Sequence, residues 1–250
     1  MIIRTEAVVL RSIDYGETSQ IVTLFTRKKG RLAVMAKGAR RTKSSFGSTL
    51  QPMAYTQVVF YYRDTRGLQT LSESAHLKPF LDLRRDLEKI TLGLRLVEFV
   101  YALTEEEDAQ PSLFDLLAAS LRALDAASER PANVLPYFQL RLAGVLGFAP
   151  AFEKTDVQAL TGEGGVLSLE SGHLFPEGQA PETTRKRVSR AALRAFAVFA
   201  RASLDDVMRM RLPAAVRREV QSLADDYLRY HVGPDAFPDR SAEVAAHLFR

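Results

Sequence analysis

Seven basic side chains fall within residues 28–43, and this span holds no aspartate or glutamate. Lysine and arginine neutralise phosphate groups, and arginine can also grip a phosphate through two hydrogen bonds or stack on a base. This chemistry favours a polyanion such as DNA, whose binding would weaken steeply with salt. The alternative is a solvated loop that carries solubilising charge. The candidate DNA-binding residues are Lys28, Lys29, Arg31, Lys37, Arg40, Arg41 and Lys43.

A second basic cluster lies in the C-terminal half, beside apolar residues at helical spacing. Leu193, Phe196 and Phe199 would form the apolar side of that helix. Cations next to such a surface suit an acidic protein tail that ends in an aromatic residue. The candidate tail-binding residues are Arg185, Lys186, Arg187, Arg190 and Arg194.

Four aromatic residues, Tyr55, Phe60, Tyr61 and Tyr62, have ring faces on which DNA bases can stack. Alternation along a strand places Phe60 and Tyr61 on opposite faces, so at least half of these rings must pack inside. No single ring is therefore assigned to ligand binding.

No pattern in the chain predicts catalysis or a metal site. The stretch Gly38–Ser44 differs from a phosphate-binding loop because Thr42, and not glycine, precedes the lysine. Adjacent carboxylates on a helix diverge by about 100°, so Asp205–Asp206 and Asp225–Asp226 are interpreted as helix-surface charge. The acidic run Glu105–Asp108 is interpreted as a solvated loop. The four histidines are scattered and share no metal-ligand spacing: His76, His173, His231 and His247.

The composition is that of a soluble globular protein without cysteine, which excludes disulfides and thiolate metal sites. No apolar run reaches the ~18 residues of a membrane span. The start of the chain is too short and too charged for a signal peptide, so we expect a cytoplasmic protein with no membrane partner. Residues 1–80 hold 13 Lys/Arg and 5 Asp/Glu, a balance of +8, against +4 for the whole chain. Such concentration is typical of nucleic-acid binding.

Five short strands are expected at the start of the chain, at residues 5–12, 20–27, 30–37, 54–62 and 68–74. They are rich in β-branched residues and are separated by turn sequences. Five strands with turns between them favour a small barrel, and the OB-fold fits best. The basic residues then flank the third strand and continue into the loop that follows it.

Near residue 80 the hydrophobic period changes from two to about 3.6, which predicts a helical bundle. One helix would present a stripe of Leu83, Leu87, Ile90, Leu94, Val97 and Tyr101, and the next a stripe of Leu113, Leu116, Leu117, Leu121 and Leu124. More helices are expected at residues 137–146, 188–202, 214–230 and 242–249. Residues 148–182 hold five glycines and three prolines and predict a loop-rich insertion with at most a small hairpin.

The predicted fold is α+β and multi-domain, with an N-terminal five-stranded OB-fold barrel followed by an α-helical bundle with a small insertion. The expected segments are a nucleic-acid-binding barrel (residues 1–80), the first part of the helical domain (81–147), the insertion (148–182) and the second part of the helical domain (183–250).

Short motifs occur in order along residues 1–150. They are Glu6–Leu10 (EAVVL), Tyr15–Glu17 (YGE), Ile21–Thr26 (IVTLFT), Gly30, Ala36–Ser44 (AKGARRTKS), Leu50–Pro52 (LQP), Leu113–Leu117 (LFDLL) and Leu140–Pro150 (LRLAGVLGFAP). Together they resemble the RecO family of bacterial recombination-repair proteins. The basic run ending in serine, with LQP shortly after it, is the most specific part of the resemblance.

The resemblance implies an OB-fold, a helical bundle and a small zinc-binding insertion. It implies binding of single- and double-stranded DNA, annealing of complementary strands, and a nucleoid-associated place in the cytoplasm. The implied partners are RecR, the C-terminal tail of the single-strand-binding protein and, indirectly, the recombinase RecA. By position, the family's DNA-contacting loop corresponds here to Lys37, Arg40, Arg41 and Lys43.

The chain departs from the family at the zinc-binding insertion. The family often carries two Cys-x-x-Cys pairs, and the corresponding positions here are Thr155, Gln158, Phe175 and Gly178. None supplies a thiolate, so a structural zinc site of that kind is excluded. We expect no metal and no cofactor. The insertion would instead be held by the apolar residues Val166, Leu167, Leu169, Leu174 and Phe175.

The sequence therefore predicts a non-enzymatic DNA repair and recombination mediator. Two alternatives stay open. One is a helical adaptor that docks protein tails and binds DNA incidentally. The other is a metal-dependent nuclease, which would need carboxylates brought together in space.

Overall fold

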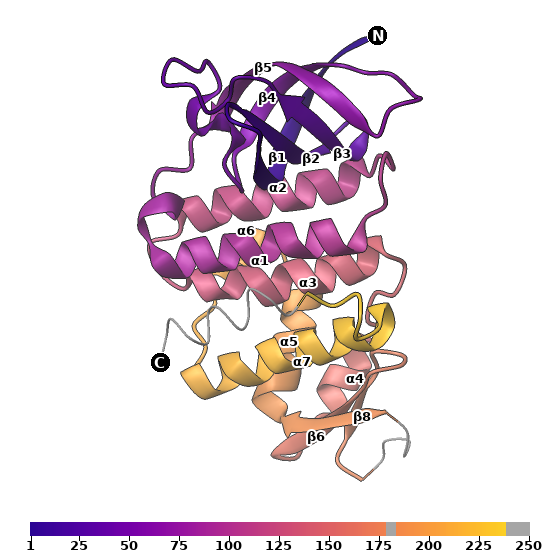
Figure 1. Ribbon diagram of the computed structural model, residues 1–250. Helices are drawn as coiled ribbons and strands as arrows, with labels where there is room; N and C mark the ends of the chain where they lie inside the picture. Colours follow the sequence, from indigo (N-terminus) through magenta and orange to yellow (C-terminus); the bar gives the residue numbers. More distant parts are fainter. Residues whose placement is uncertain (179–183, 239–250) are drawn as a thin grey trace. The chain divides into compact units, whose positions relative to one another are not determined.

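The computed structural model describes residues 1–178 and 184–238 (Figure 1). The helix expected at residues 242–249 lies outside the described residues, as does the end of the predicted insertion. The chain divides into two compact units, Met1–Ala126 and Ala127–Phe237. This division differs from the predicted segments, because the first two long helices group with the barrel.

The first unit is built around a closed five-stranded barrel. Its strands are β1 (Ile2–Tyr15), β2 (Ser19–Thr26), β3 (Gly30–Ala36), β4 (Tyr55–Tyr61) and β5 (Leu68–Lys78). They follow the order β1-β2-β3-β5-β4 around the barrel, and β4 pairs with β1 to close it. All pairs are antiparallel except β3 with β5. This barrel is consistent with an OB-fold and confirms the predicted fold class.

Alternating burial along the strands fills the barrel. In β3, Leu32, Val34 and Ala36 point inward, while the residues between them are half-buried. After β3 the chain leaves the barrel and returns at Phe46 and Leu50, which belong to the same core cluster. Phe46 directly precedes the 3-10 turn η1 (Gly47–Leu50). The loop that carries the basic residues is thus held at both ends by buried apolar side chains.

Two long helices complete the first unit. They are α1 (Leu87–Leu103), preceded by the 3-10 turn η2 (Leu83–Arg85), and α2 (Pro111–Ala126), which lies between the barrel and α1 in Figure 1. Phe114 of α2 packs against Phe25 and Tyr55 of the barrel, at 6.1 and 6.4 Å between ring centres. Arg27 also pairs with Asp115 at 2.8 Å. These contacts fasten α2 to the barrel.

The predicted buried stripe is only partly confirmed, although helix α1 itself is present: Leu83 and Val97 are buried. Leu87 is 48% exposed and Tyr101 is 38% exposed, whereas the helix buries Leu92, Leu96, Phe99 and Val100. Those four residues also recur at helical spacing, so two faces fit the sequence pattern. The face that carries phenylalanine offers more apolar surface and is the one that packs inside.

The second unit combines helices with a small sheet. Its longer helices are α3 (Val134–Val145), α5 (Arg190–Arg201) and α7 (Ala214–Val232), and its short ones are the 3-10 turn η3 (Pro131–Asn133), α4 (Lys154–Ala159) and α6 (Leu204–Arg209). The sheet has the order β7-β6-β8, from β6 (Gly164–Ser168), β7 (Leu174–Pro176) and β8 (Arg185–Ser189). Within the described residues, none of the helices has both the length and the apolar character needed to cross a bilayer.

The insertion holds more regular structure than predicted. The expected hairpin is β6–β7, and β8 adds a third strand where the sequence predicts the beginning of a helix. Helix α5 begins only after Ser189, whose side chain accepts a hydrogen bond from the Ala192 backbone at 3.2 Å. This N-cap separates strand from helix. The three consecutive basic residues before it, Arg185, Lys186 and Arg187, suit the edge strand β8.

Candidate nucleic-acid interface

Strand β3 divides the predicted DNA-binding residues into two groups. The first group lies at the N-terminal end of the strand and consists of Lys28, Lys29 and Arg31. The second group follows its C-terminal end and consists of Lys37, Arg40, Arg41 and Lys43. The seven residues of β3 separate the two groups by roughly 20 Å. The seven cations therefore do not form one continuous patch.

The lysines of the first group already contact the barrel. Lys28 Nζ donates a hydrogen bond to a backbone carbonyl of β1 at 3.0 Å. Lys29 Nζ lies 4.3 Å from the centre of the Tyr62 ring, which is within the range of a cation–π contact. Both contacts keep these ammonium groups at the barrel surface.

Arg31 joins the barrel to the segment after α1. Its Nε donates to the carbonyl oxygen of Thr104 at 3.0 Å, and its guanidinium lies 3.5 Å from the carboxylate of Glu106. The same guanidinium lies over the ring of Tyr101. Only 17% of the Arg31 side chain is exposed. These contacts indicate that Arg31 stabilises the fold at this end of the barrel.

The acidic run Glu105–Asp108 packs against this end of the barrel, so its interpretation as a solvated loop is incomplete. The backbone N–H of Glu107 donates to the Arg31 carbonyl at 2.8 Å. Tyr62 donates to the Glu107 carboxylate at 2.7 Å, and this bond, together with burial, raises the pKa of Tyr62 to about 12. Gly30 has φ +63°, and a Cβ there would lie 1.8 Å from the carbonyl oxygen of Asp108. Only glycine allows this approach.

Arg40 anchors the basic loop to the turn between β1 and β2. Its guanidinium pairs with Asp14 at 3.2 Å and donates to the carbonyl oxygens of Gly16 and Glu17 at 3.2 and 3.3 Å. Its backbone N–H donates to the Thr18 carbonyl at 2.9 Å. The Arg40 side chain is nevertheless 40% exposed. It can therefore contact a ligand only in addition to holding the loop.

Three exposed cations of the second group remain available to a ligand: Lys37, Arg41 and Lys43. Within residues 1–178 and 184–238, their side chains make no hydrogen bond or ion pair. The loop that presents them is fixed by Arg40 and by a backbone hydrogen bond from the N–H of Ser44 to the carbonyl of Arg41 at 2.9 Å. Exposed, unpaired cations on a held loop are the arrangement that phosphate binding needs.

The four aromatic residues separate clearly by burial. Phe60 is fully buried and Tyr62 is 5% exposed. The ring of Tyr55 stacks on Phe80 at 6.4 Å between ring centres, and its hydroxyl donates to Glu6. Burial and that hydrogen bond raise the pKa of Tyr55. Tyr61, which is 53% exposed, offers the one open ring face among the four.

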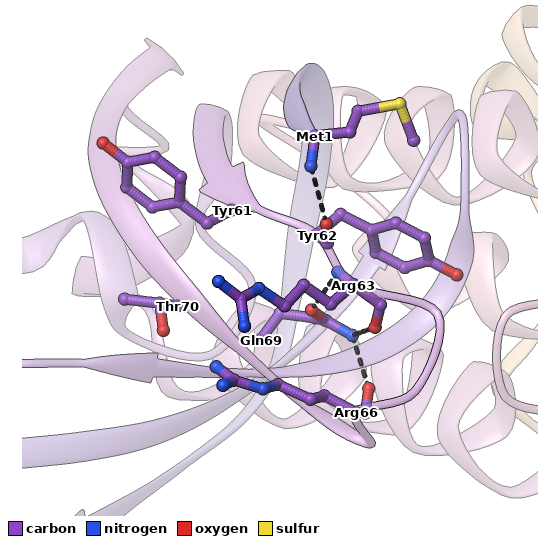
Figure 2. Close-up of a pocket in the computed structure, with 7 residues that line it drawn as sticks. All are labelled: Met1, Tyr61, Tyr62, Arg63, Arg66, Gln69 and Thr70. Atoms are coloured by element: carbon purple, nitrogen blue, oxygen red, sulfur yellow. Dashed lines mark hydrogen bonds between the residues drawn. The ribbon is translucent and has the colours of Figure 1, made fainter.

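A pocket of about 280 Å³ lies beside Tyr61, at the turn from β4 to β5 (Figure 2). Arg63 and Arg66 line it, and Figure 2 shows their side chains extending in the same direction, toward the side where Thr70 lies. Sequence reasoning missed these two arginines because they belong to one of the turn sequences between the expected strands, and no function was assigned to those turns. The signal was present, since two arginines flank a single acid there.

The candidate tail-binding cluster of the second unit is engaged in internal contacts. Four of its cations pair within the unit: Lys186 with Asp226 (2.7 Å), Arg187 with Glu177 (3.2 Å), Arg190 with the carbonyl of Thr161 (2.8 Å) and Arg194 with that of Leu160 (3.3 Å). Arg185 is exposed on β8. The apolar neighbours Leu193, Phe196 and Phe199 are fully buried. The cluster fastens the insertion to α5 and α7.

The four positions that correspond to zinc ligands lie on α4 and at β7. Thr155 and Gln158 belong to α4, Phe175 belongs to β7, and Gly178 follows it. Their side chains do not fit zinc, because none offers a thiolate or an imidazole. Among the described residues, no group of three or more His, Cys, Asp or Glu side chains could hold a metal.

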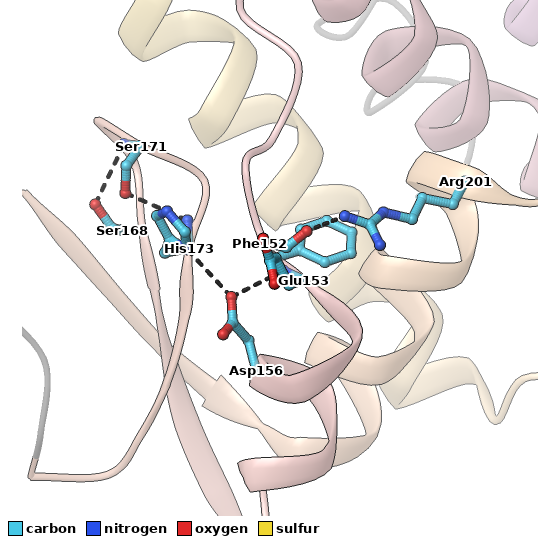
Figure 3. A network of polar contacts seen from close by, with 7 residues as sticks. All are labelled: Phe152, Glu153, Asp156, Ser168, Ser171, His173 and Arg201. Atoms are coloured by element: carbon cyan, nitrogen blue, oxygen red, sulfur yellow. Dashed lines mark hydrogen bonds and ion pairs between the residues drawn. The ribbon is translucent and has the colours of Figure 1, made fainter.

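A polar network joins the same two segments (Figure 3). His173 Nδ1, just before β7, lies 3.1 Å from the Asp156 carboxylate, and Asp156 accepts from the Glu153 backbone at 2.9 Å to begin α4. Burial raises the pKa of Asp156, but that backbone hydrogen bond and His173 outweigh it, so the net shift is downward. Arg201 donates to the Phe152 carbonyl and lies over the Phe152 ring.

The apolar cluster predicted for the insertion is partly confirmed. Val166, Leu167 and Leu174 are buried, whereas Leu169 and Phe175 are only half-buried. Phe152 and Leu160, which the sequence pattern did not single out, are at most 1% exposed.

The paired aspartates serve local structure. Asp206 bonds with Ser203, which caps α6, and Asp225 accepts from Gln139 at 2.7 Å. Asp226 pairs with Lys186. The interpretation as helix-surface charge is therefore incomplete for Asp225, because its partner Gln139 is a buried residue of α3.

Two family models match the chain over almost its whole length. The model described as "Recombination protein O N terminal" matches residues 1–80, and that described as "Recombination protein O C terminal" matches residues 84–241. The first covers the barrel, and the second covers the helices and the small sheet.

Curated proteins with the name "DNA repair protein RecO" align with nearly the full chain. The one from Salinibacter ruber is 60% identical over 247 residues, which cover 99% of this chain and 94% of that protein. Those from Chloroherpeton thalassium and Nocardioides sp. are 32% and 36% identical, covering 99% and 93% of this chain and 99% and 95% of their own lengths.

Proposed function

The chain belongs to the RecO family of DNA repair proteins, and from this premise we propose that it binds single- and double-stranded DNA and anneals complementary strands. RecO proteins are repair mediators and not catalytic enzymes. The observation that supports DNA binding most directly is the held loop with three exposed, unpaired cations, Lys37, Arg41 and Lys43, on a closed barrel.

Annealing by such a protein does not require any covalent bond to be made or broken. Cations on the loop replace condensed counterions on each strand and lower the repulsion between two strands held close together. Contacts to phosphates carry no sequence information, so binding should be largely independent of sequence. The same surface would then serve both the single strand and the annealed duplex.

The proposal extends to partners through the family. We propose that the chain acts with RecR to help load RecA onto DNA coated by single-strand-binding protein, and that it contacts the C-terminal tail of that protein. The cytoplasm, in association with the nucleoid, is the proposed location. The internal pairing of Lys186, Arg187, Arg190 and Arg194 does not favour the alternative of a tail-docking adaptor built on that cluster.

The deciding experiment is fluorescence anisotropy of labelled single-stranded and duplex DNA, titrated with the protein at low and near-physiological salt. Tight binding that weakens steeply with salt supports the proposal, and mixing two labelled complementary strands then measures annealing directly. Absence of binding to either DNA at low salt would refute it.

A further inference from the structure

The pocket beside Tyr61 combines positive charge with an open ring. Arg63 and Arg66 supply two guanidinium groups, and the N-terminal ammonium of Met1 lies at its edge, where it donates to the Tyr62 carbonyl at 3.0 Å. Within the described residues, the side chains of Arg63 and Arg66 make no hydrogen bond or ion pair. This holds even though Asp64 lies in the same turn.

A buried glutamine holds this turn in shape. Gln69, which is 1% exposed, accepts from the Arg63 backbone N–H at 2.9 Å and donates to the carbonyl oxygens of Arg63 and Arg66. The Arg66 backbone N–H also donates to the Arg63 carbonyl at 3.1 Å. All these bonds use backbone atoms of the arginines, so both guanidinium groups stay free on a fixed turn (Figure 2).

The pocket and the start of the basic loop lie on the same outer face of the barrel. Tyr61 pairs with Thr70 of β5, and Thr70 pairs with Met35 of β3. Directly paired residues point to the same face, so these three side chains form one outward row. Two strand spacings, about 10 Å, separate Met35 from Tyr61. Lys37, where the basic loop begins, follows Met35 by two residues.

We propose that this pocket binds one nucleotide of single-stranded DNA, with the base on the Tyr61 ring and the phosphate between Arg63 and Arg66. The inference rests on the proposed DNA binding and extends it to a second point on the barrel. Its volume of about 280 Å³ is near the lower limit of small-molecule sites and suits one nucleotide. A duplex keeps its bases stacked inside, so only a single strand can offer a base to the ring.

The test uses the full chain and variants that leave the turn intact. Arg63→Ala with Arg66→Ala removes both guanidinium groups but none of the backbone atoms that Gln69 holds. The matched control removes Arg211 and Arg218, two exposed arginines of the second unit that make no hydrogen bond or ion pair among the described residues. Urea unfolding checks that each variant is folded as well as the wild type.

For a labelled oligothymidine longer than ~16 nucleotides, anisotropy gives the affinity at several salt concentrations. The Arg63/Arg66 double variant should lower the slope of log affinity against log salt by about 0.7, the contribution of the one phosphate that the two arginines share, while the control double variant leaves it unchanged. Tyr61→Ala should weaken binding roughly 5- to 150-fold, and Tyr61→Phe should keep it. On an abasic oligonucleotide, Tyr61→Ala should make no difference, because no base is present to stack.

The result can separate this inference from the function on which it rests. A wild type that binds no DNA at low salt overturns both. Salt-sensitive wild-type binding that the Arg63/Arg66 and Tyr61 variants retain in full overturns the pocket alone. The assignment to a single-stranded nucleotide is overturned if the Arg63/Arg66 variant loses the same affinity for duplex as for single-stranded DNA and Tyr61→Ala has no effect on affinity.

Discussion

Replacing Lys37, Arg41 and Lys43 together with alanine should flatten the salt dependence of DNA binding without unfolding the loop. These three side chains make no hydrogen bond or ion pair among the described residues, so their removal breaks no internal contact. Arg40 stays in place because it ties the loop to the β1–β2 turn. The variant therefore tests charge and not loop structure.

The magnitude follows from the number of free cations. Each phosphate contact contributes about 0.7 to the slope of log affinity against log salt on a single strand and about 0.9 on B-DNA. Three lost contacts should lower the slope by about 2.1 on a single strand and about 2.7 on a duplex. Between about 50 and 200 mM salt, the affinity of the variant for a single strand should then fall roughly 20-fold less than that of the wild type.

Anisotropy titrations at four or more salt concentrations measure this slope. The control triple variant replaces Arg209, Arg211 and Arg218, exposed arginines of the second unit that lack hydrogen bonds and ion pairs within the described chain, and removes the same charge. Its slope should equal that of the wild type. Equal slopes for the loop variant and the wild type would show that the loop does not contact phosphate. A decrease of the slope in the control variant as large as in the loop variant would show that net charge alone governs binding.

Other outcomes are expected from the contacts described above. Gly30→Ala should destabilise the fold by at least about 2 kcal/mol, because its Cβ would meet the Asp108 carbonyl. Gly16→Ala, which has a similar φ but open space around the Cβ, should cost only about 1 kcal/mol. Urea unfolding compares the two variants, and equal losses of stability would contradict the steric reason. Asp156→Asn should cost about 1 kcal/mol at neutral pH. Since the folded-state pKa of Asp156 is lowered, its contribution is present above the unfolded-state pKa and disappears as the pH falls through the folded-state value. Unfolding at neutral and acidic pH measures this, and a difference independent of pH would contradict it. Protein made in zinc-supplemented medium should contain zinc far below one ion per chain by elemental analysis, and stoichiometric zinc would refute the prediction of no metal.

The barrel could be predicted from sequence because its signal is local. Alternation within each strand and turn residues between strands are visible over a few positions. Hydrophobic spacing alone did not predict the face that α1 buries, because Leu92, Leu96 and Phe99 recur at the same spacing as the predicted stripe. The larger apolar surface of the face with Phe99 is the difference between the two faces.

The basic residues show the same limit at the candidate site. Counting charges identifies Arg31 and Lys37 equally well, but Arg31 meets Thr104 and Glu106, which are more than 70 residues away in sequence. No local sequence pattern predicts a partner at such a distance along the chain. Arg63 and Arg66 are visible in the sequence as two arginines around one acid, but the way in which Gln69 holds their turn is visible only in the structure.

The close approach of Gly30 to Asp108 has a consequence for folding. Residues 104–108 and Phe114 contact the barrel, although they follow the end of β5 by more than 25 positions. Barrel and helices of the first unit should therefore form one cooperative folding unit, whose amide hydrogens in β3 and α1 exchange with solvent at similar free energies of opening. A fragment cut after residue 80 would expose Phe25 and leave Arg31 without its acceptors, so DNA binding is best studied on a chain that extends at least to Ala126.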